Sequence, residues 1–379
     1  MQTAALLTDS WRLLKSRKLF WITLIINLFV VLLYGSVGFN DKGVSILFGL
    51  AHFEVERFAV GLPLARELYL SIFSNFIVTL WLGWIAAALA VISTTSIFPD
   101  FLGEGAIDMV LAKPISRMRV FLVKYLGALL FVLLQVATFC IGAFACVGLR
   151  LHEWNWGLFM AIPLVVLFFS YLYCVNVFVG VLTRSTIAAL IATAIFWFVL
   201  WLTSFAETIT QQITALQEEE AKAIEADVAR LTESLAALAA QGKNSDNSDE
   251  FERTRGQLQS ARDELPGEQK DVDLAHRWLL GIRIATAALP KHEETINLVD
   301  RWVGKDPQRS LTDILMGGVP RPEPSDETRR AERRRREAAE RRVDQDRKSE
   351  SAWWIVGSSL AFELVVLGLG AWVFVRRDF

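Results

Sequence analysis

Long apolar runs separated by short polar segments fill most of this 379-residue chain. A helix needs roughly 20 consecutive apolar residues to cross the hydrocarbon core of a bilayer. Helices also satisfy their own backbone hydrogen bonds there. Six runs meet this requirement and carry almost no charge. The predicted spans are Leu19–Phe39, Leu68–Phe98, Val120–Leu149, Trp156–Leu182, Ile187–Phe205 and Ala352–Val375.

Residues 1–18 have a different pattern, with apolar Leu7, Trp11 and Leu14 on one helical face and four basic residues beside them. This predicts an amphipathic elbow helix lying on the membrane surface. The first span is longer than the apolar part of a secretion signal and is not followed by a small-residue cleavage pattern, so it is not expected to be removed. Residues 44–53 are too short to span and predict an interfacial or re-entrant piece.

The polar residues concentrate in an insertion, 207–351, which holds 24 of the 39 Lys/Arg and 30 of the 41 Asp/Glu residues. Its first part has coiled-coil spacing, and a second, weaker helical pattern ends at Pro266-Gly267. With the polar stretch Gln241–Glu250 between them, these patterns predict a helical hairpin; a spacer with helical propensity is the alternative. The apolar positions with 4-3-4-3 spacing are Ile224, Val228, Leu231, Leu235 and Leu238.

Two shorter amphipathic pieces follow, Val272–Leu289 and Glu293–Val303, separated by Pro290. Their Trp278 and Trp302 are suited to the headgroup level of the outer leaflet. The charged run 328–350 predicts a solvated helix that continues into the last span.

Composition supports the same class of protein. The chain is 53% apolar and 21% charged, with a mean hydropathy of +0.36, which excludes a disordered chain and an ordinary soluble enzyme. A net charge of −2 argues against nucleic acid as a partner. The expected fold is an all-α polytopic membrane protein in four parts: residues 1–18, the five spans of 19–206, the insertion 207–351, and the sixth span with its tail, 352–379.

The distribution of Lys and Arg between short loops predicts the orientation. With the N-terminus inside, short cytoplasmic segments carry 11 basic residues and short outer loops carry 4. Both termini are therefore expected in the cytoplasm, with the insertion outside the cytoplasmic membrane. The arginine-rich run at 329–342 opposes this count, but it alternates with acidic residues, and long segments cross membranes largely regardless of charge.

No pattern of a catalytic or metal site is present in the sequence. There is no GxxxxGK[ST] phosphate loop, GxSxG elbow, HExxH or CxxC, and the four histidines are scattered singly. The three cysteines lie inside predicted spans, as packing residues do. We therefore expect no enzyme activity, cofactor or metal in this chain.

Glu363 is the most unusual polar residue in a span, because it lies near the middle of the last one. A carboxyl there is costly and faces the bundle interior, a partner or a water-filled path. It is equally consistent with a substrate path and with a protonated, hydrogen-bonded contact between helices. The amides Asn27, Gln135 and Asn176 are more typical of contacts between helices than of ligand binding.

The loop between the second and third spans, residues 98–119, is compact and charged. A short helix from Gly105 to Leu111 is expected to lie across the cytoplasmic face and to end at Pro114. Taken alone, the loop is more typical of a simple turn with positive-inside charges.

The run Gly105–Arg117 (GAIDMVLAKPISR), the following Lys124–Gly127 (KYLG) and the terminal Phe374–Phe379 (FVRRDF) resemble ABC-2-type exporter permeases. The nearest resemblance is to the subgroup that includes the permease of the nitrous-oxide-reductase maturation transporter. It covers residues 1–206 and 272–379, and the helical insertion departs from it.

The resemblance implies a permease subunit that works as a homodimer or with a related second permease. ATP is then hydrolysed by a separate ATP-binding cassette subunit, and the loop acts as its coupling helix. An extracytoplasmic protein is a further candidate partner, at the insertion. Cargo is not identified by fold resemblance. The residues expected to contact the ATPase are Glu104, Asp108, Lys113 and Arg117.

Two other functions are alternatives. The chain could be a non-transporting membrane scaffold or envelope-assembly factor that acts through the helical insertion. An intramembrane enzyme is disfavoured, because no nucleophile–base pair or ligand set occurs in the spans.

Overall fold

The computed structural model describes residues 18–40, 43–55, 58, 62–103, 116–240, 249–303 and 327–376. The predicted elbow helix, residues 1–18, lies almost wholly outside them. The chain divides into two compact units. The first unit comprises Met1–Trp201, Leu289–Val319 and Ala352–Phe379, and the second comprises Leu202–Ala288 and Pro320–Ser351.

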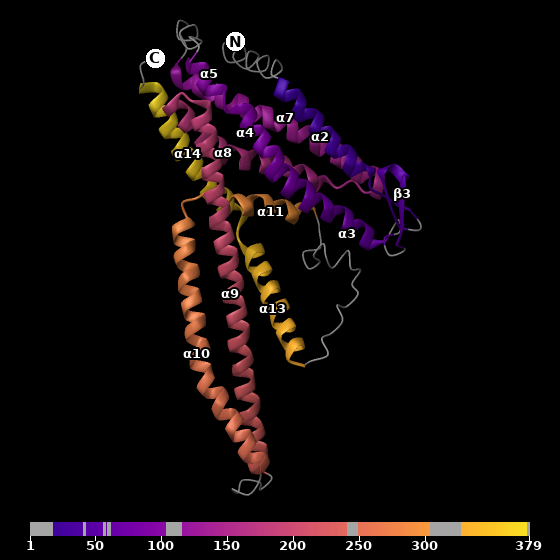
Figure 1. The fold of residues 1–379 in the computed structure, drawn as a ribbon, viewed down its shortest axis with the longest axis vertical. Coiled ribbons are helices and arrows are strands. Elements are labelled where there is room, and N and C mark those ends of the chain that lie inside the picture. The colour runs from indigo at the N-terminus through magenta and orange to yellow at the C-terminus, as the bar shows by residue number, and fades with distance from the viewer. Residues whose placement is uncertain are drawn as a thin grey trace. The chain divides into compact units, whose positions relative to one another are not determined.

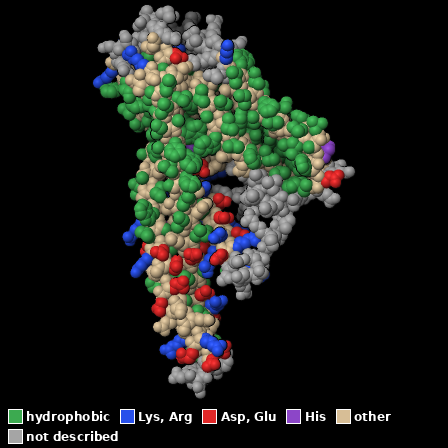
Figure 2. Space-filling model, in the orientation of Figure 1, with side chains coloured by type: hydrophobic (Ala, Val, Ile, Leu, Met, Phe, Trp, Pro, Cys, Tyr) green, Lys and Arg blue, Asp and Glu red, His purple; other side chains and the backbone are tan. Residues whose placement is uncertain are grey.

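The first unit contains the apolar helices (Figure 1). Hydrophobic side chains cover the face of it shown in Figure 2. Its helices are α2 (Lys18–Ser36), α3 (Pro63–Ile72), the π-helix η3 (Phe73–Ala86), α4 (Ala87–Thr94), α5 (Ile97–Gly103), α7 (Arg117–Leu151), the 3-10 helix η4 (Trp156–Met160), α8 (Ala161–Thr183), the first part of α9 (Thr186–Ala240), α11 (His292–Val303) and α14 (Ala352–Arg376).

Five helices are long and apolar enough, by length and composition, to span a membrane. They confirm five of the six predicted spans. The first predicted span instead corresponds to a shorter apolar helix, Phe20–Ser36, because the chain becomes extended at Gly38. The five long helices are Pro63–Gly103, Arg117–Leu151, Trp156–Thr183, Thr186–Ala240 and Ala352–Arg376.

The expectation of an all-α fold is wrong in one place. After α2 the chain forms a three-stranded antiparallel sheet of β1 (Gly38–Asn40), β2 (Gly43–Ile46) and β3 (Ala51–Glu54). In its register Phe39 pairs with Val44, which pairs in turn with Phe53. The interfacial piece expected at 44–53 is therefore extended chain, with the short 3-10 turn η1 (Leu47–Gly49) between its two strands.

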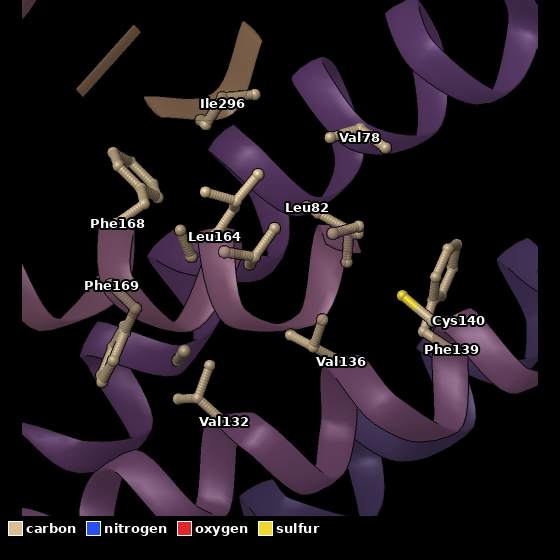
Figure 3. Packing of buried hydrophobic residues seen from close by; sticks show 14 of the residues in the cluster. Val78, Leu82, Val132, Val136, Phe139, Cys140, Leu164, Phe168, Phe169 and Ile296 are labelled. Atoms are coloured by element: carbon tan, nitrogen blue, oxygen red, sulfur yellow. The ribbon is translucent and has the colours of Figure 1, made fainter. Parts of the chain in front are cut away.

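Helix α8 is the most buried of the long helices and α9 the least: 61% of the most apolar stretch of α8 is buried and 17% of that of α9. Figure 3 shows Phe168 and Leu164 of α8 packed in one cluster with Val136 of α7 and Leu82 of η3. Because lipid tails are as apolar as these side chains, close packing rather than escape from water favours such contacts. The exposed face of α9 is available to lipid or to a partner.

Helix α11 confirms the predicted amphipathic piece at 293–303 and belongs to the first unit. It contacts α8, η3, η4 and α14. Ile296 lies in the cluster of Figure 3, and Thr295 and Val299 are fully buried. Trp302, one residue before the end of α11, is exposed. A short polar-faced helix thus contributes its apolar face to the core of the bundle.

The second unit is built from the remainder of α9 with α10 (Asp249–Thr286) and α13 (Glu327–Ser349). Charged side chains gather over these helices (Figure 2). The predicted seam residues of α9, from Ile224 to Leu238, are all half-buried. On α10 the less exposed positions alternate at spacings of three and four along the whole helix: Phe251, Thr254, Leu258, Ala261, Leu265, Glu268, Val272, Ala275, Leu279, Ile282 and Thr286.

Polar contacts record the antiparallel register of α9 and α10. Arg283 pairs with Glu207 at 3.3 Å, His276 with Glu218 at 2.8 Å, and the Gln269 amide donates to Glu225 at 3.1 Å. The residue numbers in each pair sum to nearly the same value, as antiparallel helices require. Partly exposed pairs of this kind contribute little to the free energy of unfolding. Their role is to align α9 with α10, and the apolar seam residues supply the packing between the two helices.

Two predicted helix ends in this unit are wrong. α10 does not stop at Pro266 but continues to Thr286. Proline removes only its own bond to the Arg262 carbonyl, and both residues are exposed, so water replaces the lost donor. α13 ends at Ser349 and does not continue into α14, which begins at Ala352 after a bend.

Gly157 gives a test of α11 packing. A Cβ on Gly157 would collide with the Trp302 carbonyl of α11, so we expect Gly157→Ala to lower the free energy of unfolding by about 1–3 kcal/mol. Gly281→Ala in α10 is the control, because a Cβ there meets nothing within 4 Å. It should be neutral or stabilising by up to about 1 kcal/mol. Equal effects in mixed-micelle unfolding would contradict this packing.

Candidate functional site

Glu363 lies on the inward face of α14 and is only 7% exposed. Its two carboxyl oxygens are each held by a neighbouring helix. The Tyr125 hydroxyl of α7 donates to Oε1 at 2.8 Å, and the Ser170 hydroxyl of α8 donates to Oε2 at 2.7 Å. We call these three residues the carboxyl cluster. One side chain therefore joins three of the five long helices.

Both hydroxyls of the carboxyl cluster have a second acceptor within reach. Ser170 Oγ also lies 2.7 Å from the Leu167 carbonyl, and Tyr125 Oη lies 3.3 Å from the Ser170 carbonyl. Each hydroxyl carries one proton. A neutral Glu363 can therefore donate a hydrogen bond from Oε2 to Ser170 Oγ. The Ser170 hydroxyl then donates to the Leu167 carbonyl instead of to Oε2, while Tyr125 donates to Oε1. This arrangement satisfies every group without a buried charge.

Aromatic rings enclose the carboxyl cluster. Tyr173 stacks on Tyr125 with ring centroids 5.4 Å apart, and Phe169 stacks on Tyr173 at 5.3 Å. Cys174, on the next position of α8, is buried as expected for a packing residue. Apolar rings beside the carboxyl leave less room for water, which strengthens the hydrogen bonds to Glu363.

A second polar group lies one turn away along α14. Ser359 is fully buried and accepts a 2.9 Å hydrogen bond from the Lys291 backbone N–H. The Tyr171 hydroxyl lies beside the Ser359 and Thr295 side chains, and it has no hydrogen-bond partner among the residues that the structure describes. We call Ser359, Tyr171 and Thr295 the hydroxyl cluster. The sequence alone does not predict this cluster. Its one indication is that Ser359 lies four residues before Glu363 and therefore on the same face of α14.

His292, the first residue of α11, adjoins this region and is 5% exposed. Its ring lies 6.2 Å from that of Phe168. Burial lowers the pKa of His292 to about 4, so the ring is neutral near pH 7. Its Nδ1 has no hydrogen-bond partner among the residues that the structure describes.

Other polar side chains in the bundle join helices, as expected. Trp81 Nε1 donates to Asn27 at 2.9 Å, and Gln135 donates to Thr23. Asn176 donates to Thr95 at 3.1 Å and to Thr193 at 3.0 Å. These amides are satisfied within the protein, so they are structural contacts rather than a ligand site.

Of the four residues predicted to contact an ATPase, Glu104, Asp108 and Lys113 lie outside the described residues. Arg117 is the first residue of α7, and its Nη1 donates to the Val375 carbonyl of α14 at 3.2 Å. A cation at a helix C-terminus satisfies a carbonyl that has no partner within the helix and complements the helix dipole. Arg117 thus ties the start of α7 to the end of α14.

Four phenylalanines reinforce this junction. The ring of Phe121 in α7 lies 5.2 Å from Phe98 of α5 and 5.6 Å from Phe374 of α14. Phe101 stacks on Phe374 at 6.5 Å and carries the Lys124 ammonium 5.1 Å above its ring. We call Phe98, Phe101, Phe121 and Phe374 the aromatic platform. Both ends of loop 104–116 are therefore attached to a packed junction of three helices.

No group of three or more His, Cys, Asp or Glu residues that could hold a metal ion occurs within the described ranges. The chemistry available to the carboxyl cluster is hydrogen bonding and proton exchange.

Comparisons with models of known families, with curated proteins and with solved structures find no match to this chain. Its class rests on the structure: the five long apolar helices indicate a multi-pass membrane protein.

The carboxyl cluster is tested by substitution. Ser170→Ala should lower the free energy of unfolding by about 1 kcal/mol, because it removes one hydrogen bond between helices. Glu363→Ala should cost more, since it removes both acceptors and leaves a cavity. Glu363→Gln keeps an acceptor and a donor in the same volume, so its free energy of unfolding should be close to that of the parent protein. Reversible unfolding in mixed micelles measures all three, and equal losses for Gln and Ala would contradict the hydrogen-bonded geometry.

Proposed function

We propose that this chain is the permease subunit of an ATP-binding-cassette exporter of the ABC-2 type, with ATP hydrolysed by a separate subunit. The supporting observation is the aromatic platform together with the Arg117–Val375 contact. Loop 98–119, which carries the resemblance to coupling loops, begins in α5 and ends in α7. A force applied to such a loop would enter the bundle at a packed junction rather than be lost in a flexible connection.

Helix α14 connects the aromatic platform to the carboxyl cluster inside the bundle. Phe374 of the platform and Glu363 of the carboxyl cluster lie eleven residues apart on the same helix, which is about 16 Å along its axis. Because the helix is continuous between them, a shift at the platform moves the carboxyl against α7 and α8. We assign Glu363 to the moving part of the permease on this ground.

The remaining parts of the proposal follow from the resemblance and from loop charge. Two copies, or one copy and a related permease, would form the path in the cytoplasmic membrane. Both termini would be cytoplasmic and residues 207–351 extracytoplasmic, which leaves the coiled coil of α9 and α10 available to an extracytoplasmic protein. The basic residues in short cytoplasmic segments support this orientation.

A scaffold or envelope-assembly factor is the second candidate. The observation that favours it is the continuous heptad seam of α10, which supports a specific helical hairpin over a spacer. In that case the hairpin would be the working part and no ATPase would bind loop 98–119.

Affinity purification of the tagged chain in mild detergent distinguishes the two. The permease proposal predicts a stoichiometric ATP-binding protein that is lost in the double variant Asp108→Ala/Arg117→Ala. Arg66→Ala is the control, because Arg66 is a similarly exposed arginine paired with Glu153 at 2.7 Å, far from the loop in sequence. A preparation that retains its other partners and contains no ATPase would overturn the proposal in favour of the scaffold.

A further inference from the structure

The two polar clusters lie in series on one face of α14. Ser359 and Glu363 are one turn apart and both buried. On α8, Tyr171 of the hydroxyl cluster directly follows Ser170 of the carboxyl cluster in sequence. Tyr171 and Glu363 are close enough to interact electrostatically. The buried Tyr171 hydroxyl, which has no hydrogen-bond partner among the described residues, therefore lies near both clusters and is free to turn towards either.

The series reaches the surface of the unit where α11 begins. Ser359 accepts from the Lys291 N–H, and Thr295 donates to the Lys291 carbonyl at 2.6 Å. Lys291 itself is half-buried, whereas Ser359, Thr295 and Tyr171 are fully buried. Lys291 is thus the point at which these polar groups reach a partly exposed residue.

The carboxyl at the inner end has no ion-pair partner among the described residues. Its only polar contacts there are the hydroxyls of Tyr125 and Ser170. An isolated carboxylate is expensive away from water, whereas the neutral acid is satisfied by the proton arrangement described above. The titratable groups around Glu363 on α7 and α8 are Tyr125, Tyr171, Tyr173 and Cys174, which are uncharged near pH 7. Helix α11 also packs on α14 and carries His292, which is neutral there as well.

We infer that Glu363 is a proton-binding site, which the bundle keeps protonated and which exchanges its proton with the aqueous phase through Tyr171 and Ser359 at the α11 end. Hydroxyl groups suit this path because each can accept one proton and donate another. The exchange moves a single proton between the carboxyl and water and needs no other reactant. This inference does not depend on an ATPase, so it can fail or hold independently of the proposed function.

Infrared spectroscopy of the full chain in lipid vesicles tests protonation directly. At pH 7 the protein should show the C=O stretching band of a neutral carboxyl, and Glu363→Gln should lack it. If Glu363→Gln does not fold, mapping the modification of the unaltered chain by dicyclohexylcarbodiimide replaces it, since this reagent adds to protonated carboxyls in apolar surroundings. A parent spectrum without the band, or carbodiimide modification absent from Glu363, would overturn the inference.

The path is tested by the rate at which the band shifts on transfer into D2O. Ser359→Ala and Tyr171→Phe should each slow this exchange severalfold while the band itself persists. Ser71→Ala is the matched control, because Ser71 is an equally buried serine on α3 and should exchange as the parent does. Exchange in Ser359→Ala and Tyr171→Phe at the parent rate would show that protons reach Glu363 by another route.

Discussion

A polar group surrounded by apolar helices must find its hydrogen-bond partners within the protein, because lipid offers none. Glu363 meets this requirement through Tyr125 and Ser170, which belong to two different helices. The requirement fixes how α14 is rotated against α7 and α8. The Tyr173 ring, the buried Ser359 and the close approach of α14 to Phe121 at Gly370 all depend on that rotation.

Helix α14 consequently has three distinct attachments along its length. Near its start, Ser359 accepts from the backbone of Lys291 just before α11; in its middle, Glu363 joins α7 and α8; at its end, Phe374 enters the aromatic platform. Because α14 is attached at these three places, a displacement of its end at Phe374 would also move Glu363 and Ser359. This gives a physical reason to connect events at loop 98–119 with the protonation of a carboxyl deep in the bundle.

Apolar run length sufficed to predict the five long spans, and heptad spacing sufficed for the hairpin of α9 and α10. The sheet was missed because strands of three or four residues are too short to show a period. The helix end predicted at Pro266 was wrong because the effect of a proline depends on whether the carbonyl that loses its donor is exposed to water. The sequence does not reveal this exposure.

The candidate site was predictable only in part. Glu363 is conspicuous as a carboxyl in an apolar run, but two interpretations of it were equally open. Ser170, Tyr125 and Tyr171 are ordinary residues in membrane helices, so only their three-dimensional positions reveal the cluster. The role of α11 was hidden for the same reason, because its buried face is short and its partners α8, η3 and η4 lie more than a hundred residues away in sequence.

The central claim is that the loop and Glu363 are linked through α14. It is tested by the rate at which dicyclohexylcarbodiimide modifies Glu363 in a purified complex with the proposed ATPase subunit, with and without a non-hydrolysable ATP analogue. The account predicts that the nucleotide changes this rate, and that Phe374→Ala, which removes the platform ring of α14, abolishes the change. A modification rate that is the same with and without nucleotide, in a complex that binds the analogue, would contradict it.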